Sequence, residues 1–147
     1  MKILVCTDGS EYSQKALKQA SLIAEGCNID EVAIIHVYEN KQTESPLFIS
    51  SDKQAELIRL VAEELQVERK KILEDALTFF KEKNIKLRTI LKEGHPSHTI
   101  VSVAAEEGFG MIFIGSRGLS GLEKVFLGSV SNAVAQEAKN CSVVIVK

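Results

Sequence analysis

Short runs of apolar, often β-branched residues alternate along the chain with longer segments that have helical spacing. Several of the short runs are apolar at consecutive positions, as in Val-Ala-Ile-Ile at 32–35 and Met-Ile-Phe-Ile at 111–114. Continuous apolar runs are typical of strands covered on both faces, as in a parallel sheet. They predict five strands, at residues 2–7, 31–38, 85–91, 110–115 and 142–147.

Four apolar stripes with helical spacing lie between these runs. The first spans residues 16–24, and the third and fourth span 100–104 and 130–138. An apolar stripe on a helix of a globular protein normally faces the core, so we expect these side chains to be buried. The same expectation applies to the second and longest stripe, which consists of Leu57, Leu60, Val61, Leu65, Ile72, Leu73, Ala76, Leu77 and Phe80.

The predicted elements alternate as βαβαβαβαβ within one domain, residues 1–147. Parallel strands joined by right-handed crossover helices follow from this alternation. The predicted fold class is α/β: a doubly wound, Rossmann-like domain with a five-stranded parallel sheet of order 3-2-1-4-5 and helices on both faces. The polar segment 39–52, which contains Ser45 and Pro46, is expected to be a mobile loop leading into the second helix.

Composition narrows the range of functions. The chain has 147 residues, of which 45% are hydrophobic and 26% charged, and its formal net charge is −2. A nucleic-acid-binding protein usually carries a basic surplus, so this class is disfavoured. No apolar run is long enough to span a membrane, and Cys6, Cys27 and Cys141 form no C-x-x-C pair, which suits a reducing compartment. We therefore expect a cytoplasmic protein whose partners include neither nucleic acid nor membrane.

A ligand site is expected where two of the strands end. Doubly wound sheets bind ligands at the carboxyl ends of the strands, where the strand order reverses. With the order 3-2-1-4-5, that point lies between the first and fourth strands. The segments that follow these strands, residues 6–10 and 115–118, are small, polar and loop-like.

The second of these segments continues into a glycine-rich stretch, with glycine at 115, 118, 121 and 128 before a helical pattern. Glycine permits a positive φ and close approach of a ligand to the main chain, and free N–H groups at a helix N-terminus bind anions. The hydroxyls of Ser129 and Ser131 and the guanidinium of Arg117 could add donors. A glycine-rich turn with Ser129 as an ordinary N-cap explains the pattern equally well, so both interpretations stay open on the residues alone.

The spacing Gly115-x2-Gly118-x9-Gly128-Ser129 resembles the ATP-binding pattern G-x2-G-x9-G-[ST] of the universal stress protein family. The resemblance extends over the whole chain. Residues 2–10 look like the family's first strand and Asp-bearing turn, Ile-His-Val at 35–37 like the end of its second strand, Gly-His-Pro at 94–96 like its turn after strand three, and residues 141–146 like its closing strand. Cys6 stands where the family often has proline.

The resemblance implies a role for each residue of an ATP site. Thr7 and Asp8 would lie against the adenosine, with the backbone of Cys6 beside them, and Val37 would offer its backbone to the adenine edge. On the residues alone, Asp8 could instead cap a helix and Val37 could be plain core. Ile114 and Gly115 would line the floor below the ribose and α-phosphate. The phosphate chain would be wrapped, chiefly by main-chain N–H groups, by Arg117, Gly118, Gly128, Ser129, Val130 and Ser131.

The same resemblance implies a stress-response protein regulated by ATP occupancy, with Mg²⁺ held through the phosphates, and a homodimer formed through the C-terminal strand. No catalytic residue is assigned. A slow ATPase or self-phosphorylating enzyme is the alternative, for which Glu123, His95 and His98 are the nearby candidates, although nothing fixes them by spacing. A third possibility is an interaction protein that binds no nucleotide, against which the intact glycine pattern argues.

Overall fold

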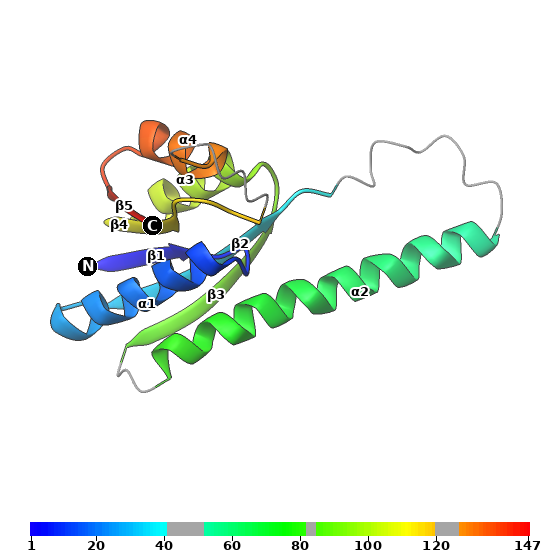
Figure 1. Ribbon diagram of the computed structural model, residues 1–147, viewed down its shortest axis with the longest axis horizontal. Coiled ribbons are helices and arrows are strands. Elements are labelled where there is room, and N and C mark those ends of the chain that lie inside the picture. The colour runs from blue at the N-terminus through cyan, green and yellow to red at the C-terminus, as the bar shows by residue number, and fades with distance from the viewer. Residues whose placement is uncertain (41–51, 82–84, 120–126) are drawn as a thin grey trace.

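The protein contains one sheet of five parallel strands in the order β3-β2-β1-β4-β5 (Figure 1). This computed structural model describes residues 1–40, 52–81, 85–119 and 127–147. The predicted fold class and strand order are confirmed. The strands are β1 (Lys2–Cys6), β2 (Glu31–Tyr38), β3 (Lys86–Glu93), β4 (Met111–Gly115) and β5 (Ser142–Val146).

Helices cover both faces of the sheet because its central strands are apolar at consecutive positions. Along β1, Leu4 and Cys6 pack into the core on one face of the sheet, whereas Ile3 and Val5 pack into the core on the other face. The first face is covered by α3 (Pro96–Glu106) and α4 (Ser129–Glu137), and the second by α1 (Glu11–Gly26), α2 (Asp52–Leu77) and the short 3₁₀ helix η3 (Thr78–Phe80).

The predicted strand ends agree with the structure to within two residues. The largest difference is at β3, which was expected to end at Leu91 and continues to Glu93. The extra residues are polar, yet Lys92 and Glu93 remain in register with Val37 and Tyr38 of β2. Because β3 is an edge strand, its end stays in the ladder without needing apolar side chains.

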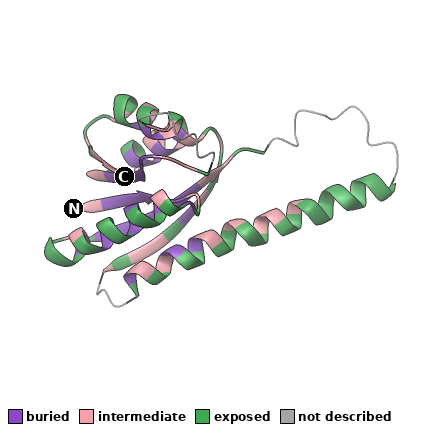
Figure 2. Ribbon diagram, viewed as in Figure 1, coloured by how far each residue is buried: buried purple, intermediate pink, exposed green. Residues whose placement is uncertain are grey.

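One expectation about the core is wrong. Leu57, Leu60 and Val61 were expected to be buried, but they are 62%, 50% and 38% exposed. The reason is length: α2 has 26 residues, and at about 1.5 Å per residue it is much longer than the sheet beneath it. Its N-terminal half therefore projects past the sheet, as Figures 1 and 2 show, and the buried residues of α2 are Leu73 and Ala76.

The predicted loop at 39–52 lies mostly outside the described residues. Glu39 and Asn40 follow β2 without regular structure, and Asp52 already belongs to α2. Within the described ranges, no helix combines the length and apolarity needed to cross a membrane.

Candidate functional site

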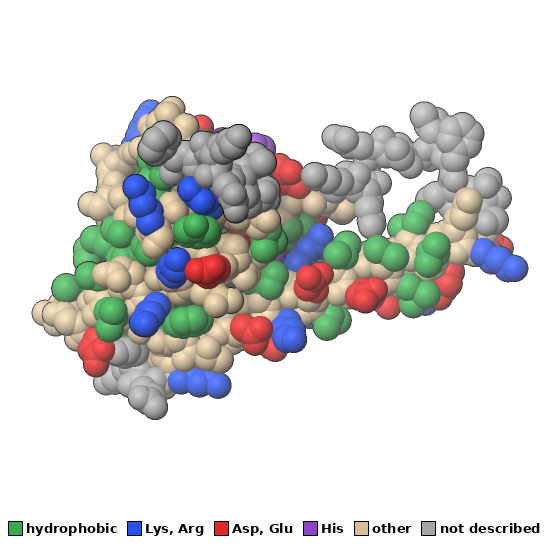
Figure 3. All heavy atoms as spheres, viewed as in Figure 1, with side chains coloured by type: hydrophobic (Ala, Val, Ile, Leu, Met, Phe, Trp, Pro, Cys, Tyr) green, Lys and Arg blue, Asp and Glu red, His purple; other side chains and the backbone are tan. Residues whose placement is uncertain are grey.

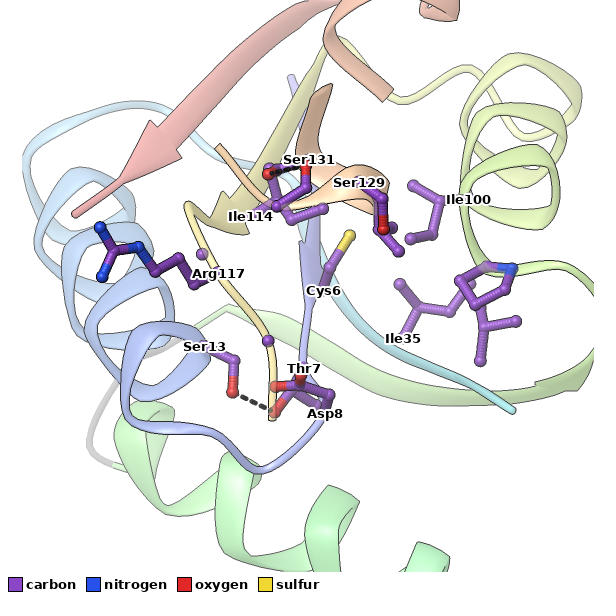
Figure 4. A pocket seen from close by; sticks show the side chains of 16 residues that line it. Cys6, Thr7, Asp8, Ser13, Ile35, Ile100, Ile114, Arg117, Ser129 and Ser131 are labelled. Carbon is purple, nitrogen blue, oxygen red and sulfur yellow. Dashed lines mark hydrogen bonds between the residues drawn. The ribbon is translucent and has the colours of Figure 1, made fainter. Parts of the chain in front are cut away.

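A pocket of about 200 Å³ opens at the carboxyl ends of β1 and β4, the point where the strand order reverses. All twelve residues proposed from the sequence line this one pocket. Figure 4 shows some of them around it, among them Cys6, Thr7 and Ser129. Sequence reasoning missed Ser13, Ile35, Pro96 and Ile100, which also line it.

One side of the pocket is apolar. Ile35 and Val37 project from the same face of β2, because alternate strand residues share a face. Ile100 of α3 and Ile114 at the end of β4 pack into the same core cluster as Ile35. A flat apolar ring could be enclosed between these side chains.

The turn after β1 forms a polar wall that is braced by the protein itself. Thr7 donates its N–H to the Ile35 carbonyl at 2.9 Å, and its own carbonyl is hydrogen-bonded to Nδ1 of His36 at 2.8 Å. Its hydroxyl lies 3.2 Å from the Ser13 hydroxyl, which donates to the carbonyl of Ser10. The backbone of this turn is therefore held in place without a ligand.

Asp8 connects the turn after β1 to the loop after β4. One carboxylate oxygen accepts the N–H of Ser10 at 3.0 Å, and the other accepts the N–H of Leu119 at 3.2 Å. Asp8 thus braces the turn before α1 and also lines the pocket. It is not the helix cap that the simpler of its two predicted roles required, because the N-cap of α1 is Ser10.

The two ends of the glycine-rich stretch are joined at the N-terminus of α4. The Gly128 N–H donates to the Ser116 carbonyl at 2.7 Å, and the Ser131 hydroxyl lies 3.2 Å from the same carbonyl. That hydroxyl is also 3.0 Å from the Gly128 carbonyl, so its proton is used within the protein. What Ser131 offers the pocket is its backbone, since the first N–H groups of a helix have no partner inside it.

A positive φ, one of the two reasons expected for the glycines, does not apply. None of Gly115, Gly118 and Gly128 has a positive φ. A β-carbon on Gly115 would lie 2.7 Å from the carbonyl carbon of Tyr12, and one on Gly118 would lie 2.7 Å from Oδ2 of Asp8. At these two positions the protein itself occupies the space that a side chain would take. Gly121 lies outside the described residues.

The charged end of Arg117 is turned away from the pocket. Its guanidinium carbon lies 5.6 Å from the ring centre of Tyr12 on α1, and Nη1 is 3.4 Å from the Tyr12 hydroxyl. Figure 4 shows the side chain directed away from Ser129 and Cys6. In this arrangement the guanidinium contacts an aromatic side chain and does not face the first turn of α4.

The remaining titratable groups add little reactivity. Burial, and secondarily the charge of Asp8, raises the pKa of the Cys6 thiol far above its ordinary value, so the thiol stays protonated at neutral pH. His95 lies before α3, with Nδ1 3.2 Å from the Ser97 hydroxyl, and neither it nor His98 lines the pocket. Glu123 lies outside the described residues. Within the described ranges, no three His, Cys, Asp or Glu residues gather as a metal site.

Comparison with known proteins identifies the family. The family model described as "Universal stress protein family" matches residues 1–147. The chain is 40% identical to universal stress protein YxiE of Bacillus subtilis over 147 residues, which cover 99% of this chain and 98% of that relative.

Solved structures agree with this assignment. The structure of MJ0577 of Methanocaldococcus jannaschii has a TM-score of 0.80 and 28% identity, covering 99% of this chain and 94% of that one. A universal stress protein crystallised in complex with cAMP has a TM-score of 0.71 and 26% identity, covering 100% and 97%. The chain therefore belongs to the universal stress protein family.

Proposed function

We propose that this protein binds ATP in the pocket between β1 and β4, and that occupancy of the pocket changes its conformation or its partners in a stress response. The adenosine lies against Ile35, Val37 and Ile100, with Asp8 and Thr7 beside the ribose. The phosphates lie at the first turn of α4, where the N–H groups of residues 129–131 meet them.

The observation that carries this proposal is the division of the pocket into two chemically different ends. One end is walled by isoleucine and valine, and the other is formed by the start of a helix whose partial positive charge favours anions. A nucleotide has the same division, with an aromatic base at one end and phosphates at the other. The relative crystallised with cAMP supports an adenine nucleotide as the ligand class.

The metal in this proposal is Mg²⁺ carried by the phosphates. Among the described residues, Asp8 is the only carboxylate lining the pocket, and its two oxygens already accept main-chain N–H groups. Mg²⁺ commonly retains several waters and binds through substrate phosphates, which fits a site with so few oxygen ligands.

The assembly proposed is a cytoplasmic homodimer formed through β5. This strand lies at the edge of the sheet, and its residues Val143–Val146 are only partly buried. An apolar edge strand offers unpaired backbone groups to a second strand.

Any hydrolysis in this proposal is slow. Rapid phosphoryl transfer needs a group that orients water and a charge placed against the transferred phosphoryl. Asp8 is engaged with main-chain N–H groups, and the Arg117 guanidinium lies over Tyr12. Phosphate release well above the rate without protein would favour the enzyme alternative instead.

Two measurements test nucleotide binding. Denaturing the purified protein and chromatographing the supernatant should release adenine nucleotide close to one per chain. Adding Mg·ATP to nucleotide-free protein at a hundredfold excess over Kd should stabilise it by about 2.7 kcal/mol, or roughly 5–10 °C in melting temperature. Absence of both effects would remove the proposal. If cAMP raised the melting temperature and ATP did not, the pocket would bind adenine, and the proposal that a phosphate chain lies at the first turn of α4 would be wrong.

A further inference from the structure

The projecting half of α2 carries a regular line of exposed residues, which we call the α2 seam: Lys53, Leu57, Leu60 and Glu64. All four are exposed, the two leucines by 62% and 50%. Their spacing of four, three and four residues is the heptad spacing of helices that pair along one face. Figure 3 shows hydrophobic side chains exposed along this helix.

The seam faces away from the protein's own core. At about 100° per residue, it lies on the side of α2 opposite Leu73 and Ala76, the residues by which the helix packs on the domain. Leu57 and Leu60 gain little from packing against the described part of their own chain. They indicate contact with a second helix.

The order of the charged residues in the seam indicates that the second helix is α2 of another copy of this chain. In an antiparallel pair of two identical α2 helices, Lys53 lies opposite Glu64 of the second copy when Leu57 lies opposite its Leu60. The midpoint of both pairings lies between residues 58 and 59. A single two-fold axis therefore brings all four residues of one seam opposite their partners in the other. In a parallel, in-register pair, lysine would face lysine and glutamate would face glutamate.

The basic residue that lies between the two leucines in the sequence does not compete for Glu64. Arg59 already pairs with Glu56 at 2.9 Å and lies 3.9 Å from Glu63, on a different side of the helix. Within the described part of the chain, neither Lys53 nor Glu64 takes part in an ion pair. The contact also lies in the projecting part of α2, so an antiparallel arrangement keeps the two domains at opposite ends of the helix pair (Figure 1).

We propose that the α2 seam pairs antiparallel with the same seam of a second copy of this chain, through a Leu57–Leu60 centre closed at each end by a Lys53–Glu64 ion pair. This contact is separate from the edge of β5 and does not depend on nucleotide. Four layers make a small interface, below the roughly 1,200 Å² of stable complexes, so the association is weak and reversible.

Sedimentation equilibrium of the full chain, from about 10 µM to about 1 mM, measures this association in the range expected for a small interface. The wild-type mass should rise with concentration. Lys53→Glu and Glu64→Lys should each weaken the association about tenfold, because each places like charges together at two symmetric positions. The double variant K53E/E64K should recover it, since the pair is restored with its signs exchanged.

Two comparisons separate the seam from other contacts. Leu57→Ser should abolish the association, whereas Leu22→Ser, which changes a 55% exposed leucine on α1, should leave it intact. If the wild-type mass does not rise at any concentration up to about 1 mM, the proposal is overturned, because even a weak specific contact should be detectable by that concentration. The proposal would also be overturned if either single charge variant associated as strongly as wild type, or if the double variant did not recover wild-type association. Changes in melting temperature without changes in mass would mean that the seam packs within its own chain.

Discussion

The carboxylate of Asp8 accepts a hydrogen bond from the main-chain N–H of Leu119, and this contact joins the turn after β1 to the loop after β4. Both segments line the pocket, and the other long-range hydrogen bonds described above tie them to different elements, Thr7 to β2 and Ser116 to the start of α4. The shape of the pocket therefore depends on a side chain that also lines it.

Replacing Asp8 should loosen this loop before any ligand is considered. Asp8→Ala leaves the N–H groups of Ser10 and Leu119 without their acceptor, at a cost of about 1–3 kcal/mol in the free energy of unfolding. Hydrogen exchange at residues 117–119 should speed up. Asp8→Asn keeps one acceptor oxygen and should fall between alanine and wild type. Unchanged exchange in Asp8→Ala would contradict the bracing role.

Gly115 should tolerate no side chain. Its β-carbon would lie 2.7 Å from the carbonyl carbon of Tyr12 and 2.9 Å from the Ser13 nitrogen, both backbone atoms of α1. Gly115→Ala should therefore cost about 2–4 kcal/mol and lower the melting temperature by roughly 5–15 °C.

The control for this substitution is Gly26→Ala, at the end of α1. Nothing lies within 4 Å of the added β-carbon there. The expected result is a gain of about 0.5–1 kcal/mol, because alanine restricts the unfolded chain. Equal melting temperatures for the two variants would contradict close packing of α1 on β4.

A substitution at Ser129 should change ligand binding without weakening the fold. It is the first residue of α4, where a carboxylate stabilises the helix by about 0.3–1 kcal/mol, so Ser129→Asp should fold at least as well as wild type. The same charge should repel phosphates and weaken ATP binding at least tenfold, whereas the neutral Ser129→Asn should bind nearly as well as wild type. Calorimetric titration with Mg·ATP measures both. If the Ser129→Asp and Ser129→Asn variants bound ATP with equal affinity, the phosphates would not lie at this end of the pocket.

Glu31 should give the stability a specific pH dependence. Hydrogen bonds from Arg88 and then Lys86 hold the pKa of the Glu31 carboxyl below its ordinary value of 4.5. Because the pKa is lower in the folded state, the stabilisation is present above about pH 4.5 and is lost as the pH falls through the folded-state value. Glu31→Gln should cost about 1–3 kcal/mol at pH 7, with the difference from wild type shrinking below pH 4.5.

Chemical denaturation at several pH values measures this effect. Glu74→Gln, on an exposed position of α2, is the matched control and should change stability by less than about 0.5 kcal/mol at every pH. A Glu31→Gln deficit that stays constant down to pH 3 would show that the ion pairs contribute nothing.

The sheet was predictable because its strands are buried on both faces, which leaves an unmistakable apolar run such as 111–114. The pocket's position followed from where those strands end. Sequence alone could not say which residues of β2 and α3 face the pocket, and so Ile35 and Ile100 were missed. The alternation of Ile35 with Val37 was the available signal, since two strand residues that far apart share a face.

One error, and one side-chain direction that the sequence could not give, have physical causes outside the sequence pattern. Leu57 and Leu60 have the periodicity of core residues, but periodicity does not reveal where a helix extends beyond the sheet that it packs on. The direction of Arg117 depends on Tyr12, a residue on a different element whose ring holds the guanidinium. The twelve proposed site residues do line one pocket, and their role in ATP binding stays a prediction.

The close approach of Gly115 to α1 and of Gly118 to Asp8 has a consequence for how family signatures are interpreted. Gly115 faces backbone atoms of α1, so the architecture of the domain excludes a side chain there whether or not a ligand is bound. At Gly118 the obstructing atom is the end of the Asp8 side chain, which can move aside. Ser129 is exposed, and its side chain is not constrained by packing in this way. A glycine at position 115 is therefore expected from the fold alone, and a requirement for nucleotide would be visible in the sequence only at positions such as Ser129.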